Sequence, residues 1–174
     1  MTTVRMECSG LWTQGADDER APVSFLEQAE EIGHIHGRLT IEIAGKQVPS
    51  LGYFGPDDVC LDTWLVELCN VVNRLARSGD EYTFDEGEQG QPAFRFTRLG
   101  SELVLSIVDS ALSGRSGNPD WQNVTCLFED FRAAVIGLLD ALRAELRRQA
   151  PTTWEQWWPT DAVIHDVPTQ PDDE

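Results

Sequence analysis

Several short segments of the chain alternate between hydrophobic and polar residues, as strands do when one face is buried and the other is exposed. Residues 2–8 follow this pattern, with a hydrophobic side chain at every second position from Val4 to Cys8. Residues 38–48 alternate in the same way, and Ala44-Gly45-Lys46 supplies the turn of a β-hairpin. Further strands are predicted at 81–85, 92–98, 102–108 and 121–126.

Two longer segments carry hydrophobic residues three and four positions apart, which is the spacing of an amphipathic helix. The first helix is predicted over residues 59–78 and the second from Phe128 to Leu146, with Pro151 following as a stop signal. A shorter helix is predicted within residues 22–31. Strands in several runs, interrupted by two long helices, indicate an α+β fold. We expect an antiparallel sheet of about five to seven strands, with both long amphipathic helices packed on one face.

Length and composition indicate a single globular domain. The chain has 174 residues, of which 41% are hydrophobic, and this is enough to form a sizeable core. We expect the domain to cover residues 1–150 and a Trp-containing acidic tail to cover residues 151–174. The N-terminus lacks the basic and apolar regions of a signal peptide, and no segment approaches about 18 uninterrupted apolar residues. With four scattered cysteines, these features predict a cytoplasmic protein with reduced thiols and no membrane association.

The charge of the chain is strongly negative and unevenly distributed. The chain contains 30 acidic and 13 basic residues, which gives a net charge of −17. Residues 1–90 contain 17 acidic and six basic residues, residues 91–150 contain seven of each, and residues 151–174 contain six acidic residues and no basic one. Such a field repels nucleic acid and anionic lipid and attracts basic proteins. The charge therefore predicts a basic protein partner, with no nucleic acid and no membrane as partners.

Five carboxylates surround a predicted strand and turn between residues 80 and 90. A calcium site is not the favoured interpretation, because the ligand spacing of an EF-hand loop is absent. A solvated hairpin loop explains the composition most simply, and an acidic edge that binds Arg and Lys of a partner is the functional alternative. The carboxylates predicted to bind a partner belong to Asp80, Glu81, Asp85, Glu86 and Glu88.

Three tryptophans, Trp154, Trp157 and Trp158, would share one face of a short helix in the tail. Burying them would contribute on the order of 10 to 15 kcal/mol, as an upper bound. Ordering six to eight residues of the tail would cost roughly 9 to 12 kcal/mol. Because these terms nearly cancel, docking of the tail on its own domain is the favoured interpretation, and a partner with a better pocket could compete for the same face.

His34 and His36 are two residues apart, so their rings would point the same way in an extended segment. A third ligand, such as His165 or a carboxylate, could then complete a metal site. Histidines with this spacing are common beside strands without a metal, and we favour that interpretation, so no metal and no cofactor are predicted. The sequence also has no nucleophile elbow and no reactive-thiol motif, so no catalytic residue is predicted.

An acidic cytoplasmic protein without catalytic motifs is well suited to neutralise a basic protein, because opposite charges accelerate association. Residues 36–150 resemble small, acidic, single-domain bacterial immunity proteins that accompany polymorphic toxins. The resemblance rests on Thr63-Trp-Leu-Val-Glu-Leu, Tyr82-Thr-Phe-Asp-Glu-Gly-Glu and Asp109-Ser-Ala-Leu-Ser-Gly, the last followed by Asn118-Pro-Asp-Trp. It implies direct, stoichiometric binding of a cognate toxin by a non-catalytic, antidote-type inhibitor.

Two alternatives remain open on the sequence. The first is a small enzyme or ligand-binding domain, whose cleft would use carboxylates such as Asp57, Asp58 or Asp109. A deep apolar pocket with convergent carboxylates would favour it over a binding protein with a shallow acidic surface. The second is a subunit of a larger assembly that is held through the face of Trp154, Trp157 and Trp158.

Overall fold

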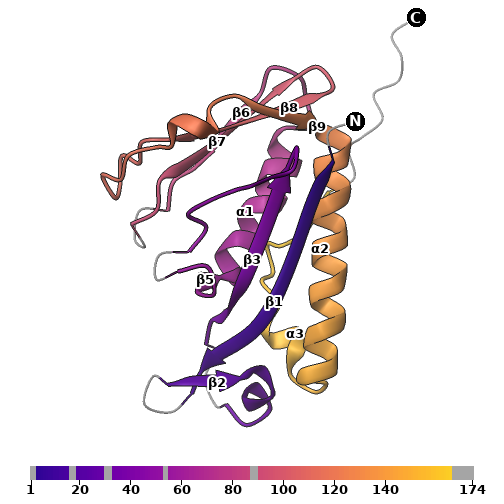
Figure 1. Cartoon of the computed structure of the whole chain (residues 1–174). Helices are drawn as coiled ribbons and strands as arrows, with labels where there is room; N and C mark the ends of the chain where they lie inside the picture. Colours follow the sequence, from indigo (N-terminus) through magenta and orange to yellow (C-terminus); the bar gives the residue numbers. More distant parts are fainter. Residues whose placement is uncertain (1–2, 16–18, 30–32, 53–54, 87–89, 166–174) are drawn as a thin grey trace, which may run out of the picture.

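The computed structural model of the chain describes residues 3–15, 19–29, 33–52, 55–86 and 90–165. The strands form two antiparallel sheets, which we call sheet A and sheet B (Figure 1). In sheet A the strand order is β2-β1-β3-β4, and β5 pairs with the other end of β3. The strands of sheet A are β1 (Val4–Gln14), β2 (Arg20–Pro22), β3 (Ile35–Ile43), β4 (Lys46–Gln47) and β5 (Val59–Cys60).

Sheet B contains four strands in the order in which they follow each other along the chain. They are β6 (Glu81–Phe84), β7 (Ala93–Leu99), β8 (Glu102–Val108) and β9 (Val124–Leu127). The helices are α1 (Leu61–Arg74), α2 (Phe128–Gln149) and α3 (Trp154–Trp157), with 3-10 turns η2 (Val23–Glu27) and η3 (Pro119–Trp121). Over the described parts of the chain, no helix combines the length and the apolar character needed to cross a membrane.

The predicted α+β class, the antiparallel strands and the two long helices are confirmed. The strands are divided between two sheets of five and four strands rather than joined in one. All strands of sheet A precede α1 in the chain, and all strands of sheet B follow it. The short helix predicted within residues 22–31 is the 3-10 turn Val23–Glu27, and residues 30–32 lie outside the described residues.

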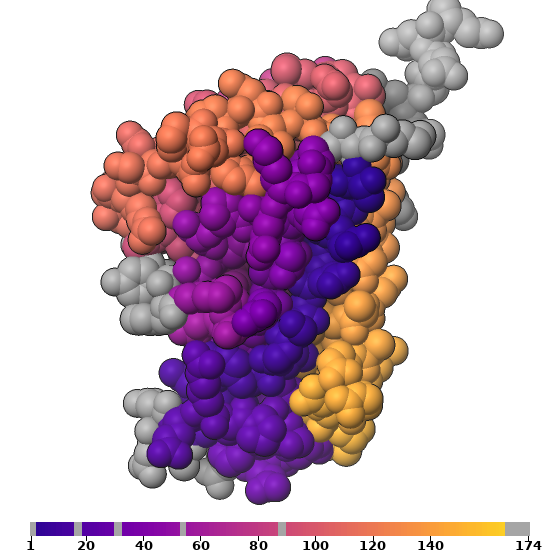
Figure 2. All heavy atoms as spheres, viewed as in Figure 1, coloured from indigo at the N-terminus to yellow at the C-terminus, as the bar shows by residue number. Residues whose placement is uncertain are grey.

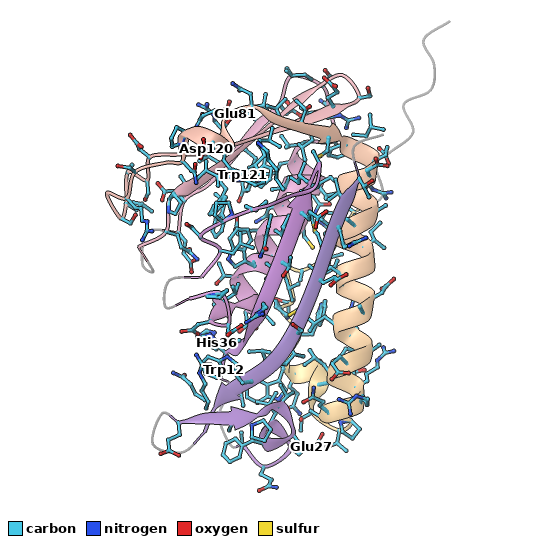
Figure 3. The ribbon with its side chains drawn as sticks, in the orientation of Figure 1. Trp12, Glu27, His36, Glu81, Asp120 and Trp121 are labelled. Atoms are coloured by element: carbon cyan, nitrogen blue, oxygen red, sulfur yellow. The ribbon has the colours of Figure 1, made fainter. Side chains whose placement is uncertain are left out.

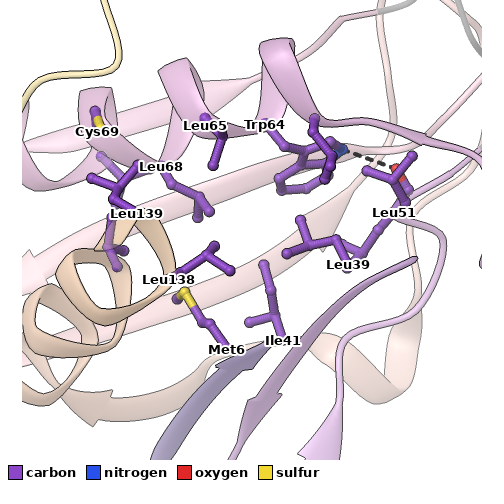
Figure 4. Packing of buried hydrophobic residues seen from close by; sticks show 14 of the residues in the cluster. Met6, Leu39, Ile41, Leu51, Trp64, Leu65, Leu68, Cys69, Leu138 and Leu139 are labelled. Atoms are coloured by element: carbon purple, nitrogen blue, oxygen red, sulfur yellow. Dashed lines mark hydrogen bonds between the residues drawn. The ribbon is translucent and has the colours of Figure 1, made fainter. Parts of the chain in front are cut away.

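The inner face of sheet A packs against both long helices. Figure 1 shows α1 behind β3 and α2 alongside β1, with sheet B across one end of this layer. Met6 of β1 is directly opposite Ile41 of β3, and both side chains are buried. Figure 4 shows them facing Leu138 of α2 and Leu68 of α1. The alternation of β1 and β3 therefore marks the face that the helices cover.

Trp64 of α1 joins sheet A to sheet B. Its ring meets Phe84 and Phe94 of sheet B edge to face, with centroids 5.0 and 5.1 Å apart. The indole NH donates a hydrogen bond of 2.9 Å to the carbonyl of Leu51, so the one polar atom of this buried ring is satisfied. The two sheets therefore share one hydrophobic core, which the contacts of this single side chain help to make continuous.

The segment after α2 is docked on the rest of the chain. Trp157 and Ala162 are buried, and residues 159–165 run back along the helices (Figure 1). Asn73 of α1 fixes the end of this segment, since its side chain donates to the carbonyl of Val163 at 2.7 Å and accepts from the backbone NH of His165 at 2.9 Å. Residues 151–165 thus pack on the domain, as the favoured interpretation of the tryptophans expected, and contribute Trp157 and Ala162 to the core.

Candidate functional site

The start of β3, the short strand β5 and the first turn of α1 meet at one end of sheet A. β5 pairs with β3 so that Cys60 lies opposite His36. α1 begins at the next residue, which places Asp62 in its first turn. His34 immediately precedes β3. These elements bring together residues that are far apart in the sequence, and His34, His36, Asp58, Cys60 and Asp62 form what we call the His-Cys-Asp cluster.

Donor atoms of different elements approach one another within this cluster. His34 Nδ1 lies 3.0 Å from Asp62 Oδ2, and the two atoms form a hydrogen bond. One ligand atom each from His34, Cys60 and Asp62 all lie within 4.8 Å of one another. Cys60 is buried, whereas the side chain of His34 is 66% exposed. The cluster is therefore anchored inside the protein and open to solvent on the His34 side.

His36 forms a second contact beside the first. Its Nδ1 lies 3.0 Å from Asp58 Oδ1, at the distance of an ion pair if the imidazole is protonated. The indole ring of Trp12 in β1 stacks on the imidazole ring of His36, with ring centroids 4.4 Å apart (Figure 3). The imidazole is therefore held between an indole ring and a carboxylate.

Backbone and charged groups fix Trp12 in turn. Its indole NH donates a hydrogen bond of 3.0 Å to the carbonyl of Asp57, and the guanidinium of Arg20 lies 4.4 Å from the ring centroid. Arg38 forms an ion pair with the Asp57 carboxylate. These contacts connect β1, β2, β3 and the segment before β5, so the surroundings of His36 are rigidly defined.

Burial determines the protonation of the cluster. It lowers the pKa of His36, against the opposing effect of Asp58, so this imidazole is neutral at pH 7. Burial raises the pKa of the Asp62 carboxyl, although the hydrogen bond with His34 acts in the other direction. Burial also raises the pKa of the Cys60 thiol, and the nearby carboxylates of Asp62 and Glu86 add to the effect. Cys60 is therefore a protonated thiol at neutral pH and is not activated as a nucleophile.

The acidic residues predicted around 80–90 take different roles in the structure. The Asp85 carboxylate accepts hydrogen bonds from Ser110 Oγ at 2.5 Å and from the backbone NH of Ala111 at 2.9 Å, so it supports a neighbouring loop. Glu81 is exposed on β6 and accepts a hydrogen bond of 3.2 Å from Thr97 Oγ1. Asp80 is half-buried, and Glu86 is near enough to Cys60 to influence its pKa. Glu88 lies outside the described residues.

The three tryptophans of the C-terminal segment lie far from these carboxylates. Trp157 is buried, with 6% of its surface exposed. Trp154 and Trp158 are half-buried against arginines of α2, because Arg147 and Arg143 lie 4.4 Å from the centroids of their rings. Figure 1 places α3 at the opposite end of α2 from sheet B. A helix of 22 residues is about 33 Å long, so the acidic residues of β6 and the tryptophans do not form one surface.

Among the described residues, the groove beside the segment that follows β4 lacks the convergent carboxylates of a catalytic cleft. A groove of about 430 Å³ runs beside residues 47–52, and the described residues that line it include Leu39, Val48 and Pro56 but no ionisable side chain. Asp57 and Asp58, which a cleft enzyme was predicted to use, instead contact Arg38 and His36. Asp109 accepts a hydrogen bond of 2.8 Å from the backbone NH of Gly117. These three carboxylates therefore do not converge on the groove.

Sequence reasoning identified His34 and His36 but not their neighbours. His165, considered as a third metal ligand, is exposed at the end of the C-terminal segment, and its backbone is bonded to Asn73. Cys60 and Asp62 take the place next to His34 instead. The one local signal for them was the proximity of Cys60 and Asp62 in sequence at the start of a predicted helix.

Comparison with known proteins gave no match: no protein family, no curated protein and no solved structure resembles the chain.

Proposed function

We propose that the chain is a non-catalytic binding protein, an immunity or antidote-type inhibitor that neutralises a basic protein partner through an acidic surface. The observation that carries the proposal is a difference between the contacts of the arginines and those of the carboxylates. Many arginines are engaged within the chain, whereas many carboxylates are exposed without a cationic partner. The net charge of −17 is therefore directed at the surroundings.

Three kinds of contact engage the arginines. Arg148 donates to both oxygens of Glu145, at 2.9 and 2.6 Å. Arg98 donates to the carbonyls of Leu75 and Ala76, at 2.9 and 2.6 Å, and its guanidinium lies 4.0 Å from the ring centroid of Phe128. Arg143 and Arg147 stack on tryptophans. These groups are less able to neutralise carboxylates elsewhere on the surface.

Unlike these arginines, many carboxylates are exposed and have no cationic partner among the described residues. Nine exposed carboxylates form no ion pair with any described residue, and they are distributed over both sheets and the C-terminal segment. Such a field attracts a basic partner over a distance of about 10 Å at 0.1 M ionic strength, and it accelerates association more than it adds affinity. The nine residues are Glu7, Glu19, Glu81, Glu102, Asp109, Asp120, Glu129, Glu155 and Asp161.

The contact itself is assigned to the acidic residues around β6. β6 is an edge strand of sheet B, and Glu81 projects from it into solvent (Figure 3). Carboxylates held by a sheet are well placed to bind the guanidinium groups of a partner. Asp85 supports the loop at Ser110, so we assign it to the shape of this surface rather than to direct contact.

Affinity capture with two variants of equal charge tests the proposal. The first variant, Asp80→Asn/Glu81→Gln/Glu88→Gln, neutralises the proposed contact. The control, Glu19→Gln/Glu155→Gln/Asp161→Asn, removes the same number of charges elsewhere. Wild type and control should retain one stoichiometric basic protein from a lysate of the source organism after a wash at about 0.5 M salt, and the first variant should lose it. Equal loss in both variants would contradict the assigned contact, and capture of no basic protein would contradict the function.

A small ligand-binding or enzymatic domain remains the second candidate because of the His-Cys-Asp cluster. The protonated thiol of Cys60 argues against nucleophilic catalysis there. An assembly held through the tryptophan face is less well supported, because Trp157 is buried in its own chain and would have to detach first.

A further inference from the structure

We propose that His34, Cys60 and Asp62 form a binding site for one divalent transition-metal ion of the zinc class. The proposal rests on the placement of three donor atoms and goes beyond the function proposed above. It is independent of that function, because a metal could bind here whether or not the protein has a basic partner.

The distances between the three ligand atoms suit a tetrahedral site. Zinc lies about 2.0–2.2 Å from nitrogen and oxygen ligands and about 2.3 Å from sulfur, so ligand atoms around it are separated by roughly 3.3–3.6 Å. His34 Nδ1 and Asp62 Oδ2 are already 3.0 Å apart, and one ligand atom from each of His34, Cys60 and Asp62 lies within 4.8 Å of the other two. Small rotations of the side chains would bring all three atoms to bonding distance around one ion.

The elements of the fold hold the ligands in different ways. Cys60 is buried at the end of β5 and is fixed by the pairing of this strand with β3. Asp62 is in the first turn of α1, and its side chain is 25% exposed. The His34 side chain is 66% exposed and is the most able to move. Two ligands are therefore preorganised, and the third can close on the ion from the solvent side.

The charges around the cluster favour a cation. Asp57, Asp58 and Asp62 lie within six residues of one another, and Arg38 forms an ion pair with Asp57 alone among them. A divalent ion bound by one thiolate, one carboxylate and one neutral imidazole would form a site without net charge. The ion would also replace the hydrogen bond between His34 and Asp62 with stronger coordination bonds.

The donor set distinguishes between classes of metal. Calcium and magnesium prefer six or more oxygen ligands, whereas nitrogen and sulfur ligands select zinc and related transition metals. Three protein ligands leave one tetrahedral position on the exposed side of His34. Water would complete the coordination there, as in zinc sites that keep an open position.

Cobalt(II) titration of the full chain, prepared without a polyhistidine tag, tests the site. We expect one equivalent of cobalt to produce visible bands of tetrahedral geometry and a near-ultraviolet band from thiolate coordination, and we expect zinc to displace both. Cys60→Ser should abolish the thiolate band, whereas Cys8→Ser, a control at another cysteine, should retain it. His34→Ala and Asp62→Asn should weaken cobalt affinity by about tenfold or more.

Zinc should also raise the melting temperature of the wild-type chain and of Cys8→Ser, but not that of Cys60→Ser. Far-ultraviolet circular dichroism of the metal-free variants checks that each is folded. The proposal is overturned if the wild type gives no thiolate band, or if the band survives in Cys60→Ser. Capture of a basic partner by metal-free protein would leave the proposed function intact, so the two proposals fail separately.

Discussion

Glu27 and Thr152 are 125 residues apart in the sequence and are joined by hydrogen bonds to the same carboxylate. The backbone NH of Thr152 donates to Glu27 Oε1 at 2.8 Å, and its hydroxyl donates to Oε2. Figure 3 shows Glu27 at the end of the molecule where α3 lies. The turn η2 and the segment that leads into α3 are therefore tied together through one side chain.

The link between Glu27 and Thr152 predicts that docking of the C-terminal segment depends on pH. Hydrogen bonds from the side chain and backbone of Thr152 lower the pKa of Glu27 in the folded protein. The ionised Glu27 carboxylate therefore contributes its full stabilisation above its ordinary pKa of about 4.5. This stabilisation is lost as the pH falls through the lower pKa that Glu27 has in the folded protein. Tryptophan fluorescence of the wild type should change over this range before global unfolding. Glu27→Gln should remove the change, and an identical acid transition in both proteins would contradict the prediction.

Deleting the C-terminal segment tests whether residues 151–165 belong to the domain. A chain that ends at Ala150 loses the buried side chains of Trp157 and Ala162. We expect its free energy of unfolding to fall by at least about 3 kcal/mol, as for removal of a buried tryptophan. Urea denaturation measures the loss. A chain that ends at His165 is the control, because it keeps every described contact, and equal stability of the two chains would show that the tryptophans do not stabilise the domain.

Asn73 offers a more local test of the same segment. Asn73→Ala removes two hydrogen bonds to the backbone of Val163 and His165. We expect a loss of about 1–3 kcal/mol in the free energy of unfolding and faster proteolysis near residue 163. Asn70→Ala is a matched control on the same helix, since the Asn70 side chain donates a hydrogen bond of 3.2 Å to Glu67, three residues away, and also bonds to Tyr82. If both variants behave alike, Asn73 does not anchor the segment.

Replacing Trp12 should affect both stability and the titration of His36. Trp12→Ala removes the stacked ring and the hydrogen bond to Asp57, and should cost about 1–3 kcal/mol. Because burial is the main cause of the low pKa of His36, exposing the imidazole should move this pKa upward toward its ordinary value.

The titration can be followed by nuclear magnetic resonance of the imidazole protons. In the wild type, the lowered pKa of His36 means that the unfolded chain binds a proton more readily, so stability should decrease as the pH falls below about 6.5. Trp12→Phe keeps an aromatic ring and should shift the pKa less than Trp12→Ala does. An unchanged pKa in Trp12→Ala would show that the stacked ring does not desolvate His36.

Sequence periodicity was sufficient to place the longer strands and both long helices, with their buried faces. The hairpin predicted at residues 38–48 is present as β3 and β4, with Ala44 and Gly45 in the left-handed conformation that its turn requires. The first long helix begins at Leu61 rather than at residue 59, because residues 59–60 pair with β3 as β5. A strand of two residues is too short to produce a periodic pattern, so β5 could not be predicted.

The same short pairing explains why the site was only partly predicted. Cys60 reaches His34 and His36 through the β3–β5 pairing and not through any spacing in the sequence. The position of Trp12 depends on another local irregularity. One extra residue in β1 shifts the register between Ser9 and Trp12, where Gly10 has a φ of +60°. This bulge puts Trp12 rather than Leu11 opposite His36, and a simple alternation cannot show it.

The contact between Met6 of β1 and Leu138 of α2 has a consequence for the newly made chain (Figure 4). The two residues are separated by roughly 130 positions, which take on the order of ten seconds to synthesise. During that time β1, β3 and α1 can associate, but α2, the second helix that covers the hydrophobic face of sheet A, has not yet left the ribosome. The excess of acidic residues in positions 1–90 would keep such incomplete chains apart by mutual repulsion. The uneven charge of the sequence thus protects the protein at the stage when its core is most exposed.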